Sequence, residues 1–472
     1  MTITLYDDQT DLVTRVRKAT ARHKAVLMQS ATGSGKTRMA LDMIAGAHAK
    51  GSSCIFAVPR KELLAQTIQT IEEYGIPFGV ISPDHAPNPF AKIQIAMTPT
   101  LARRLDKVKP PKLLFIDECH YGGAELERTI DWSRASGGWR IGLSATPYKT
   151  NGRGMGDWYD HMEEGLPVAD LMERGRLSKY RYFAPSAPDL SGVASRGGEY
   201  VQSQLQGFME EQTAIIGDAV KTYRETAWGK LCVVFATSRK HAEIIRAAYV
   251  EAGIAAQVID GTMNKDQRKA VIQGFARRQF TVLINVQLLT FGFDLAAAAD
   301  MDVTIEAMSD LCPRKSMPMQ MQVWGRVLRM KPFPAIINDH ANNWRENGFP
   351  DDARQWSLEG TAKRAASGEK TVPAKQCPIG DGGCGFVHRP GPPCCPSCGF
   401  RYPVMSRMVD EVDGHLIEVS PEALRLAAKQ ERQVQGRAET LADLVELAKR
   451  TGKNPRWAQH VWQARQRKAG AR

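Results

Sequence analysis

A glycine-rich run at residues 30–37, Ser-Ala-Thr-Gly-Ser-Gly-Lys-Thr, is the first segment of the sequence whose residue types suggest chemistry. Glycines such as Gly33 and Gly35 let the backbone curl so that successive N–H groups point at phosphate oxygens. Lys36 would then reach the β- and γ-phosphates of ATP, and the Thr37 hydroxyl would bind Mg²⁺. A glycine-rich turn with an incidental lysine is the simpler alternative. The expected nucleotide-binding residues of this run are Thr32, Gly33, Ser34, Gly35, Lys36 and Thr37.

The surroundings of this run favour a phosphate-binding loop. The apolar residues Ala25–Gln29 precede it and a helical pattern follows it, which is the strand–loop–helix order that such a loop requires. The N-terminus of the following helix would direct its positive dipole end at the phosphates. The strict pattern begins with glycine, and Ser30 stands in that place.

Two neighbouring carboxylates, Asp117 and Glu118, follow the apolar run Leu-Leu-Phe-Ile. Acidic side chains at the end of a buried strand are costly unless they serve a cation. We expect Asp117 to hold Mg²⁺ and Glu118 to orient and deprotonate the attacking water. Alone, the four residues could form a solvated turn. We expect Cys119 to pack and His120 to relay contacts, rather than to act as a nucleophile and its base.

Five of the nine cysteines crowd into residues 377–398. In a cytosolic chain such a cluster indicates a metal rather than disulfides, and four thiolates suit a tetrahedral structural zinc site. Cys394 could replace its neighbour Cys395, His388 is a weaker substitute, and a loop with free thiols is the alternative. The four expected zinc ligands are Cys377, Cys384, Cys395 and Cys398.

The charge balance favours a polyanionic partner. The formal charge is +12, and the last 24 residues hold eight Lys or Arg and no Asp or Glu. Trp457 and Trp462 lie among these charges, and arginine with tryptophan suits phosphate contact and base stacking. An amphipathic helix that packs both tryptophans on a neighbour is the alternative. We expect nucleic acid as the partner.

The composition gives no sign of a membrane or secreted protein. The sequence has no run of about 18 uninterrupted apolar residues, which a membrane span requires. Residues Met1–Asp8 lack the basic start and apolar run of a secretory signal. We therefore expect a cytoplasmic location and no membrane partner.

Short apolar runs alternate with helical patterns, which predicts an α/β fold with parallel sheets buried on both faces. The runs form two series, separated by a Gly-, Pro- and Arg-rich stretch with a helical insertion at Val168–Glu173. Two lobes with a cleft between them follow from this pattern. The expected strands are Ala25–Gln29, Ser53–Val58, Ile93–Met97, Leu113–Ile116 and Arg140–Leu143, then Leu231–Ala236, Ala256–Ile259, Thr281–Asn285, Val303–Glu306 and Ala335–Asn338.

Together these features resemble the motifs of superfamily 2 helicases, and most closely the RadD-type bacterial DNA-repair helicase-like proteins, over most of the chain. Tyr6 and Gln9 resemble the upstream motif that reads adenine. Residues 58–66 and 98–100 resemble the motifs that contact the nucleic-acid backbone. Residues 144–147, Ser-Ala-Thr-Pro, resemble the motif that couples the ATP state to domain movement.

The second half of the chain continues the resemblance. Residues 322–329 resemble the closing motif of the family, which implies that Arg326 and Arg329 are arginine fingers toward the γ-phosphate. Residues 290–294, Thr-Phe-Gly-Phe-Asp, resemble a motif usually written with Glu before Gly-Phe-Asp. Phe291 occupies the place of that Glu, and Asp294 is retained near the nucleotide. Smaller matches lie at residues 235–239, 339–343 and 356–358.

The resemblance implies two tandem RecA-like parallel-sheet domains, followed by a small zinc-binding module and a helical basic tail. The predicted boundaries are 1–175 for the N-terminal RecA-like domain, 176–205 for a linker, 206–345 for the C-terminal RecA-like domain, 346–376 for a second linker, 377–400 for the zinc module and 401–472 for the tail.

These observations predict an ATP-dependent, Mg²⁺-dependent helicase or translocase that acts on nucleic acid. The resemblance favours DNA over RNA and a task in repair, recombination or replication. One alternative is the motor subunit of a restriction or defence complex. Another is an ATP-switched clamp or loading factor that does not unwind nucleic acid, and Phe291 keeps this alternative open.

Overall fold

The computed structural model of the chain describes residues 4–149, 152–184, 188–196, 199–286, 288, 295–299, 301–360, 374–379, 382–390, 392–402, 440–450 and 461–462. The chain divides into two compact units, Met1–Tyr402 and Pro403–Arg472. Within the described part, no helix has the length and apolar character needed to cross a membrane.

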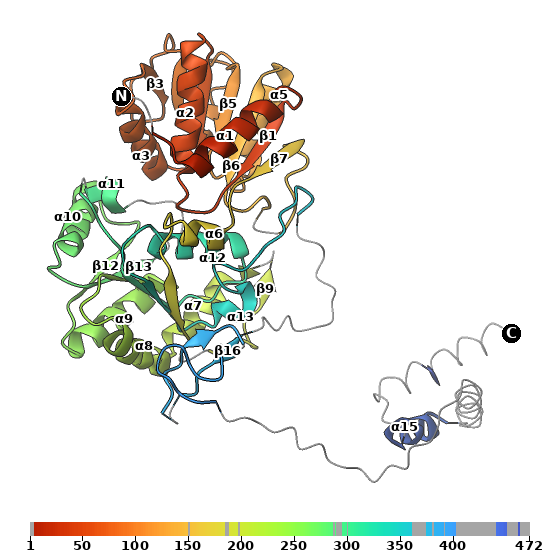
Figure 1. Cartoon of the computed structure of the whole chain (residues 1–472), viewed down its shortest axis with the longest axis vertical. Coiled ribbons are helices and arrows are strands. Elements are labelled where there is room, and N and C mark those ends of the chain that lie inside the picture. Colours follow the sequence, from red (N-terminus) through yellow and green to blue (C-terminus); the bar gives the residue numbers. More distant parts are fainter. Residues whose placement is uncertain are drawn as a thin grey trace. The chain divides into compact units, whose positions relative to one another are not determined.

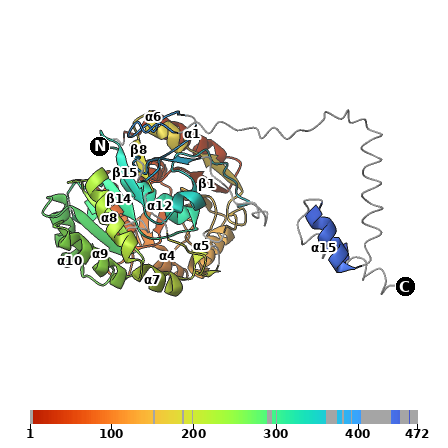
Figure 2. The same ribbon diagram turned by 90° about the horizontal axis from the view of Figure 1, so that it is seen from below.

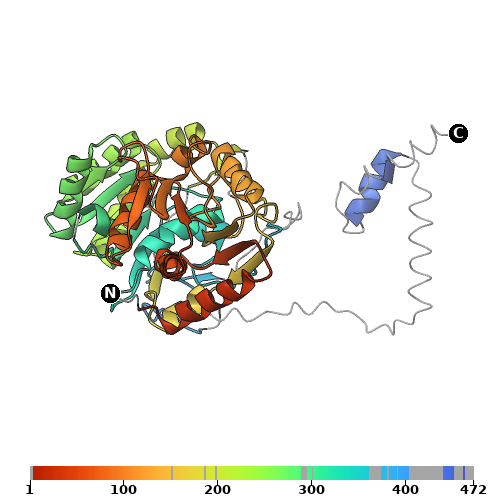
Figure 3. The ribbon, with the colours of Figure 1, turned by 90° about the horizontal axis from the view of Figure 1, so that it is seen from above.

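The first lobe of the first unit is built on a parallel sheet of seven strands in the order β3-β4-β2-β5-β6-β1-β7 (Figure 1). Its strands are β1 Ala25–Gln29, β2 Cys54–Val58, β3 Phe78–Ile81, β4 Ile93–Met97, β5 Leu113–Ile116, β6 Trp139–Ser144 and β7 His161–Glu164. Its helices are α1 Asp7–Ala19, α2 Lys36–Ala49, α3 Lys61–Glu72, α4 Thr98–Ala102 and α5 Ala124–Ala135 (Figure 3, red to orange).

Both faces of the first sheet are covered, which explains why its central strands are apolar without a polar face. Alternate residues of β1 divide between two clusters: Val26 and Met28 pack with α1, α2 and α3, whereas Ala25 and Leu27 pack on the side of α4 and α5. The carboxyl ends of parallel strands meet at one edge of a sheet, so the loops after β1, β2, β4 and β5 are brought together there.

The second lobe is built on a parallel sheet of six strands in the order β12-β13-β11-β14-β15-β8, and Figure 2 shows β14, β15 and β8 side by side. Its strands are β8 Tyr180–Phe183, β11 Cys232–Ala236, β12 Ala256–Ile259, β13 Val282–Val286, β14 Ala307–Asp310 and β15 Ala335–Asp339. Its helices are α6 Val168–Glu173, α7 Gln202–Glu210, α8 Thr213–Thr226, α9 Arg239–Glu251, α10 Lys265–Ala276, α11 Leu295–Ala299, α12 Met317–Val327 and α13 Asn343–Asn347.

The predicted α/β fold with two parallel sheets is therefore confirmed, with one strand misplaced. The strand expected at Val303–Glu306 lies instead at Ala307–Asp310. Periodicity favoured the more apolar segment, but the true strand buries Ser309 and Asp310 inside a polar network. Glu306 precedes the strand, where its carboxylate accepts a 2.7 Å hydrogen bond from Leu231 N.

The segment between the two sheets already belongs to the second lobe. The predicted helix Val168–Glu173 is confirmed as α6, and its Leu171 and Met172 pack in the core of the second lobe. Strand β8, inside the expected linker 176–205, pairs with β15. A short hairpin, β9 Ser195–Arg196 and β10 Glu199–Tyr200, follows it.

After the second sheet, residues 356–360 return to the first lobe, and we call them the return segment. Met155 N and Gly156 N both donate hydrogen bonds to Leu358 O, at 2.8 and 2.9 Å. The Leu358 side chain packs against the first-lobe cluster that contains Met155, and Trp356 lies 5.9 Å from Tyr148, ring centre to ring centre. Of the linker expected at 346–376, residues 361–373 lie outside the described residues.

A small module with strands β16 Lys375–Gln376 and β17 Val387–His388 follows and packs on edge strand β8. Phe386 contacts Phe183 edge to face at 5.4 Å. In the second unit, described by itself, helix α15 covers Leu441–Arg450. Of the tail expected at 401–472, the structure also describes residues 401–402, 440 and 461–462, and the remainder lies outside the described residues.

Candidate nucleotide and metal sites

The glycine-rich run forms a tight loop between β1 and α2. Gly33 and Gly35 have φ angles of +85° and +89°, a region that glycine adopts without strain. A Cβ atom at Gly35 would lie 2.6 Å from Gln9 Nε2, so a side chain there would push the Gln9 amide away from its contact with Ser34 O. The loop therefore needs glycine at these positions for its backbone conformation.

Two polar groups at the loop could form new hydrogen bonds to a bound triphosphate. Lys36 Nζ donates to the carbonyl oxygens of Ser30 and Ala31, at 3.2 and 3.3 Å. Thr32 Oγ1 is buried and has no hydrogen-bond partner among the described residues. Phosphate oxygens would supply acceptors to both groups, so the loop fits the triphosphate of ATP.

Gln9 supports this loop from the first helix. Its side-chain amide donates to Ser34 O at 2.8 Å and its oxygen accepts from Tyr6 N at 3.0 Å. Gln9 is buried, whereas Tyr6 is 44% exposed. The structure thus places both residues of the expected adenine-reading motif beside the loop.

The acidic pair lies at the carboxyl end of β5. Glu118 adopts a left-handed conformation, φ 47°, and its N–H donates to Asp117 Oδ1 at 2.9 Å. Burial, together with the nearby charge of Glu118, raises the pKa of Asp117 to about 7. A buried carboxylate with so high a pKa is suited to a cation, and Thr37, half-buried in the first turn of α2, offers the second expected Mg²⁺ ligand.

The pKa of Glu118 lies below its ordinary value although the carboxyl group is buried. Burial alone would raise its pKa, but His120, Lys36, a hydrogen bond from Gln322 and the charge of Arg326 together lower it. His120 Nδ1 lies 3.4 Å from Glu118 Oε2 and 2.9 Å from Ser144 Oγ, and burial lowers the pKa of His120. An ionised carboxylate in this place can accept a proton from a water molecule.

A residue of the second lobe holds Glu118 directly. Gln322 Nε2, on α12, lies 2.9 Å from Oε1 and 3.0 Å from Oε2 of Glu118, and both residues are buried. Gln322 is the first residue of the closing motif 322–329, and the sequence did not identify it as a site residue. The sequence could have indicated this role, because Gln322 lies one helical turn before Arg326 and so shares its face of the helix.

The two expected arginines differ in position. Arg326 is buried on α12, close enough for its charge to lower the pKa of Glu118. Arg329 lies beyond the end of α12, has an exposed side chain, and lines a pocket of about 240 Å³ together with Arg326 and Asp302. The structure therefore brings Arg326 to the acidic pair, and the role of Arg329 stays a prediction.

The phosphate loop packs directly on α12. A Cβ atom at Gly325 would lie 2.2 Å from Thr32 Cγ2, and Ala31 packs in the core of the second lobe. Only glycine permits this approach, so the loop and the arginine-bearing helix meet across the lobes. Residues 290–294, which include Phe291 and the expected nucleotide contact Asp294, lie outside the described residues.

The Ser-Ala-Thr-Pro motif adjoins the same site. Ser144 Oγ donates to Thr146 O at 2.6 Å and contacts His120 Nδ1, while Thr146 Oγ1 is buried without a partner among the described residues. Burial raises the pKa of the Cys119 thiol, which opposes formation of a thiolate. These contacts agree with Cys119 as a packing residue and His120 as a relay.

A buried ionic network in the second lobe was missed from the sequence. The Arg314 guanidinium donates to both oxygens of Asp310, at 2.6 and 2.7 Å, and both side chains are almost fully buried. Asn343 and Gln320 also donate to Asp310, at 3.1 and 3.4 Å. The network fixes the loop that leads from β14 into α12.

The four expected zinc ligands come together. The sulfur atoms of Cys377, Cys384, Cys395 and Cys398 all lie within 4.8 Å of one another. Backbone N–H groups of Cys384 and Ser397 point at sulfurs of the set, at 3.3 and 3.4 Å. Four thiol groups at this spacing fit a tetrahedral zinc ion.

The two alternative ligands are directed elsewhere. His388 Nε2 lies 2.5 Å from the Tyr402 hydroxyl, and its Nδ1 lies 2.8 Å from Arg389 O. Cys394 pairs its backbone with Arg401 and is outside the group of four sulfurs. The geometry therefore favours Cys395 over Cys394.

The two expected nucleic-acid motifs lie at the carboxyl edge of the first sheet. Residues 58–66 run from the end of β2 into α3, and Thr98–Thr100 begin α4 directly after β4. Arg60 is exposed there. In the second unit, Trp462 packs against Leu444 of α15, as the packing alternative predicted, while Trp457 lies outside the described residues.

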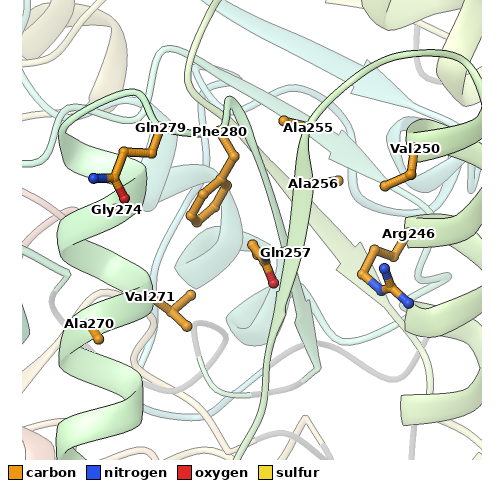
Figure 4. Close-up of a pocket in the computed structure, with 10 residues that line it drawn as sticks. All are labelled: Arg246, Val250, Ala255, Ala256, Gln257, Ala270, Val271, Gly274, Gln279 and Phe280. Atoms are coloured by element: carbon orange, nitrogen blue, oxygen red, sulfur yellow. The ribbon is translucent and has the colours of Figure 1, made fainter.

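A pocket with a volume of about 640 Å³ lies apart from these motifs, in the second lobe between α9, edge strand β12 and α10 (Figure 4). Arg246 and Val250 line one side, Val271 and Gly274 the other, and Phe280 the base. None of the expected site residues lines it.

Comparison with protein families finds two matches. Residues 2–149 match the family described as type III restriction enzyme, res subunit, and residues 213–331 match the helicase conserved C-terminal domain. The two matches correspond to the two lobes.

Three relatives illustrate the similarity. A 51.5 kDa protein of Lactococcus phage (isolate 7-9) is 30% identical over 412 residues, which cover 86% of this chain and 81% of that protein. The Schizosaccharomyces pombe protein named as mitochondrial ATP-dependent helicase irc3 is 26% identical over 58% of this chain and 47% of its own length. Among solved structures, the ATP-dependent type ISP restriction-modification enzyme LlaBIII bound to DNA has a TM-score of 0.52 at 14% identity, over 72% of this chain and 28% of that enzyme.

Proposed function

The chain belongs to the superfamily 2 helicases, and from that premise we propose that it couples Mg²⁺-dependent ATP hydrolysis to movement on, or remodelling of, DNA. One observation carries this proposal: Gln322 of the second lobe donates to both carboxylate oxygens of Glu118 in the first. The catalytic base is therefore sensitive to the arrangement of the lobes.

Each residue has a distinct task in this proposal. Glu118 accepts the proton of the attacking water, and Lys36 and Arg326 stabilise the charge that develops on the γ-phosphate. Asp117 and Thr37 would hold Mg²⁺, which neutralises phosphate charge when bound. The site is complete only when α12 lies against the phosphate loop, so closure of the lobes and hydrolysis are linked.

Two similarities and the net charge support DNA as the substrate. The first-lobe family is described by a restriction-enzyme subunit, and the LlaBIII structure, which supports the fold alone, contains DNA. The net charge of +12 favours a polyanion of either kind. A closer relation to RadD-type proteins, a role in repair, recombination or replication, and a cytoplasmic location belong to the same proposal.

Steady-state ATP hydrolysis tests the proposal. Rates are measured without polymer and with single-stranded DNA, duplex DNA, forked DNA and RNA, with Lys36→Ala beside each. Strong stimulation by DNA that disappears in Lys36→Ala is the expected result. Hydrolysis that ignores every polymer, or that RNA alone stimulates, would contradict it.

A second candidate is the motor subunit of a restriction or defence complex. The match of residues 2–149 to a res-subunit family favours it. Cleavage of DNA would then need a partner with nuclease activity. Co-purification of a nuclease with the tagged chain from its native host would support this candidate, and isolation of an active motor alone would count against it.

A further inference from the structure

The hairpin formed by β9 and β10 holds the start of α12 through one carboxylate. Glu199 Oε1 accepts a hydrogen bond from Lys315 N and Glu199 Oε2 accepts one from Ser316 N, each at 3.0 Å. Ser316 is the N-cap residue of α12, and its own side chain makes no capping hydrogen bond. Glu199, 117 positions earlier in the chain, therefore takes the place of a capping side chain, and its negative charge suits the positive end of the helix.

Lys315 is also held by both strands of the hairpin. Its Nζ donates to Ser195 Oγ of β9 at 2.6 Å and lies 4.4 Å from the centre of the Tyr200 ring of β10. Glu199 Oε1 accepts a further hydrogen bond from Tyr200 N, at 2.9 Å, which orients the carboxylate. The hairpin and the residues that lead into α12 therefore form one hydrogen-bonded unit.

The hairpin is anchored in turn on the second lobe. Tyr200 is buried and packs with Leu205 and Met209 of α7. Helix α7 is tied to the loop after β11, because Gln206 Nε2 donates to Thr237 O at 3.1 Å. The hairpin lies within residues 176–205, which were expected to be a linker, yet it connects α7 with the start of α12.

We propose that Glu199 is a positioning residue for ATP hydrolysis, which holds α12 so that Gln322 and Arg326 lie at Glu118. At a rise of about 1.5 Å per residue, these two side chains lie about 9 and 15 Å along the helix from Ser316. A helix is stiff over such a length, so a shift at its start moves both of them. The inference rests on the proposed ATPase function and adds a residue that contacts neither the nucleotide loop nor Glu118 but acts through α12.

The position of Glu199 predicts which kinetic constant depends on it. Lys36 and the phosphate loop belong to the first lobe, whereas Glu199 holds a helix of the second. Loss of Glu199 should therefore lower kcat and leave KM for ATP near its wild-type value. Partial unfolding would also lower kcat, so the test needs a measurement that follows α12 itself.

Hydrogen–deuterium exchange of the full chain without nucleotide provides that measurement. Glu199→Ala should speed exchange at residues 315–321 about fivefold and leave α8 unchanged, because the amide groups at the start of α12 lose their acceptor. Glu211→Ala removes an exposed glutamate just past the end of α7 and is the matched control. Exchange at 315–321 that is equal in wild type and Glu199→Ala would overturn the inference, whatever ATP hydrolysis shows.

ATP hydrolysis then tests the consequence for the site. We expect Glu199→Ala to lower DNA-stimulated kcat about tenfold with KM changed less than about twofold, and Glu199→Gln, which keeps one oxygen, to lower kcat about threefold. Glu199→Gln is also the second variant if Glu199→Ala does not fold. Combining Glu199→Ala with Gln322→Ala should lower kcat less than the product of the single effects, because Glu199 acts partly through Gln322.

Three kinetic results would count against the inference. They are a Glu199→Ala variant as active as Glu211→Ala, a rise in KM as large as the fall in kcat, and single effects that multiply in the double variant. A wild-type protein that hydrolyses no ATP under any condition would instead contradict the proposed function. The exchange measurement would still decide whether Glu199 holds α12.

Discussion

The nucleotide site and the four-cysteine site are built in opposite ways. The nucleotide site draws its groups from Gln9 to Arg326, on two sheets, and several of its contacts cross between the lobes. The cysteine site is contained within residues 377–398 and packs as a unit on β8. The geometry of the nucleotide site therefore depends on how the two lobes are arranged. The geometry of the cysteine site depends only on its own loops.

This difference shows which contacts can change during a reaction cycle. Lys36 donates to carbonyl groups of its own loop, and Gln322 donates to Glu118. A bound nucleotide could replace each of these hydrogen bonds with a hydrogen bond to the ligand. The four sulfur atoms, by contrast, lie within 4.8 Å of one another in one short segment of the chain. We therefore expect changes in the first site to alter rates and changes in the second to alter local folding.

The largest effect should follow loss of Lys36, the lysine that we propose contacts the phosphates. Lys36→Ala removes a cation from the γ-phosphate, and we expect kcat for ATP hydrolysis to fall on the order of 1000-fold. Lys50→Ala, an exposed lysine just past the same helix, is the control and should be close to wild type. A Lys36→Ala variant that retains more than a tenth of the activity would place the catalytic site elsewhere.

Removal of one zinc ligand should affect the other site and leave the first intact. Cys395→Ser should weaken zinc binding roughly 100-fold or more, since structural zinc binds with about 10–16 kcal/mol shared among four ligands. Metal analysis and limited proteolysis after dialysis measure this, and ATP hydrolysis without polymer should change less than about threefold. Cys394→Ser is the matched control. If it loses zinc and Cys395→Ser does not, the ligand assignment is wrong.

The contact between the lobes at Glu118 should have an intermediate effect. Gln322→Ala removes hydrogen bonds to a buried carboxylate, and we expect kcat to fall about tenfold, as for the loss of a charge-assisted hydrogen bond. Gln322→Glu should be worse at neutral pH, because two buried carboxylates would face each other. Its activity should recover as the pH falls and one of them binds a proton. Equal rates for both variants at all pH values would contradict this view of the contact.

The smallest effect should come from the return segment. Leu358→Ala removes a half-buried side chain from the first-lobe cluster, and we expect a loss of roughly 1–2 kcal/mol in the free energy of unfolding. Glu359→Ala, an exposed neighbour, is the control. Thermal unfolding followed by circular dichroism measures both, with kcat expected within about threefold of wild type. An unchanged stability would mean that the segment does not hold to the first lobe in solution.

The sequence predicted features whose residues are close together in the chain. The strand–loop–helix of Lys36 and the group of four cysteines follow from local spacing, because turn geometry and ligand chemistry act over a few residues. Strand β14 was misplaced because its polar Asp310 is stabilised by Arg314, a partner that periodicity cannot reveal. The same limit hid Gln322, whose partner Glu118 lies 204 positions earlier in the chain.

The return segment has a consequence for how the protein can be divided. The first lobe takes Leu358 from a position after the second sheet, and the zinc module then packs back on β8 of the second lobe. The chain thus passes from the first lobe to the second, back to the first at the return segment, and again to the second at the cysteine module. Cutting the gene between the two sheets would deprive the N-terminal fragment of Leu358, which packs against its apolar cluster. We expect that neither half is soluble when it is expressed alone. Co-expression of the two halves should be needed to obtain soluble, folded protein.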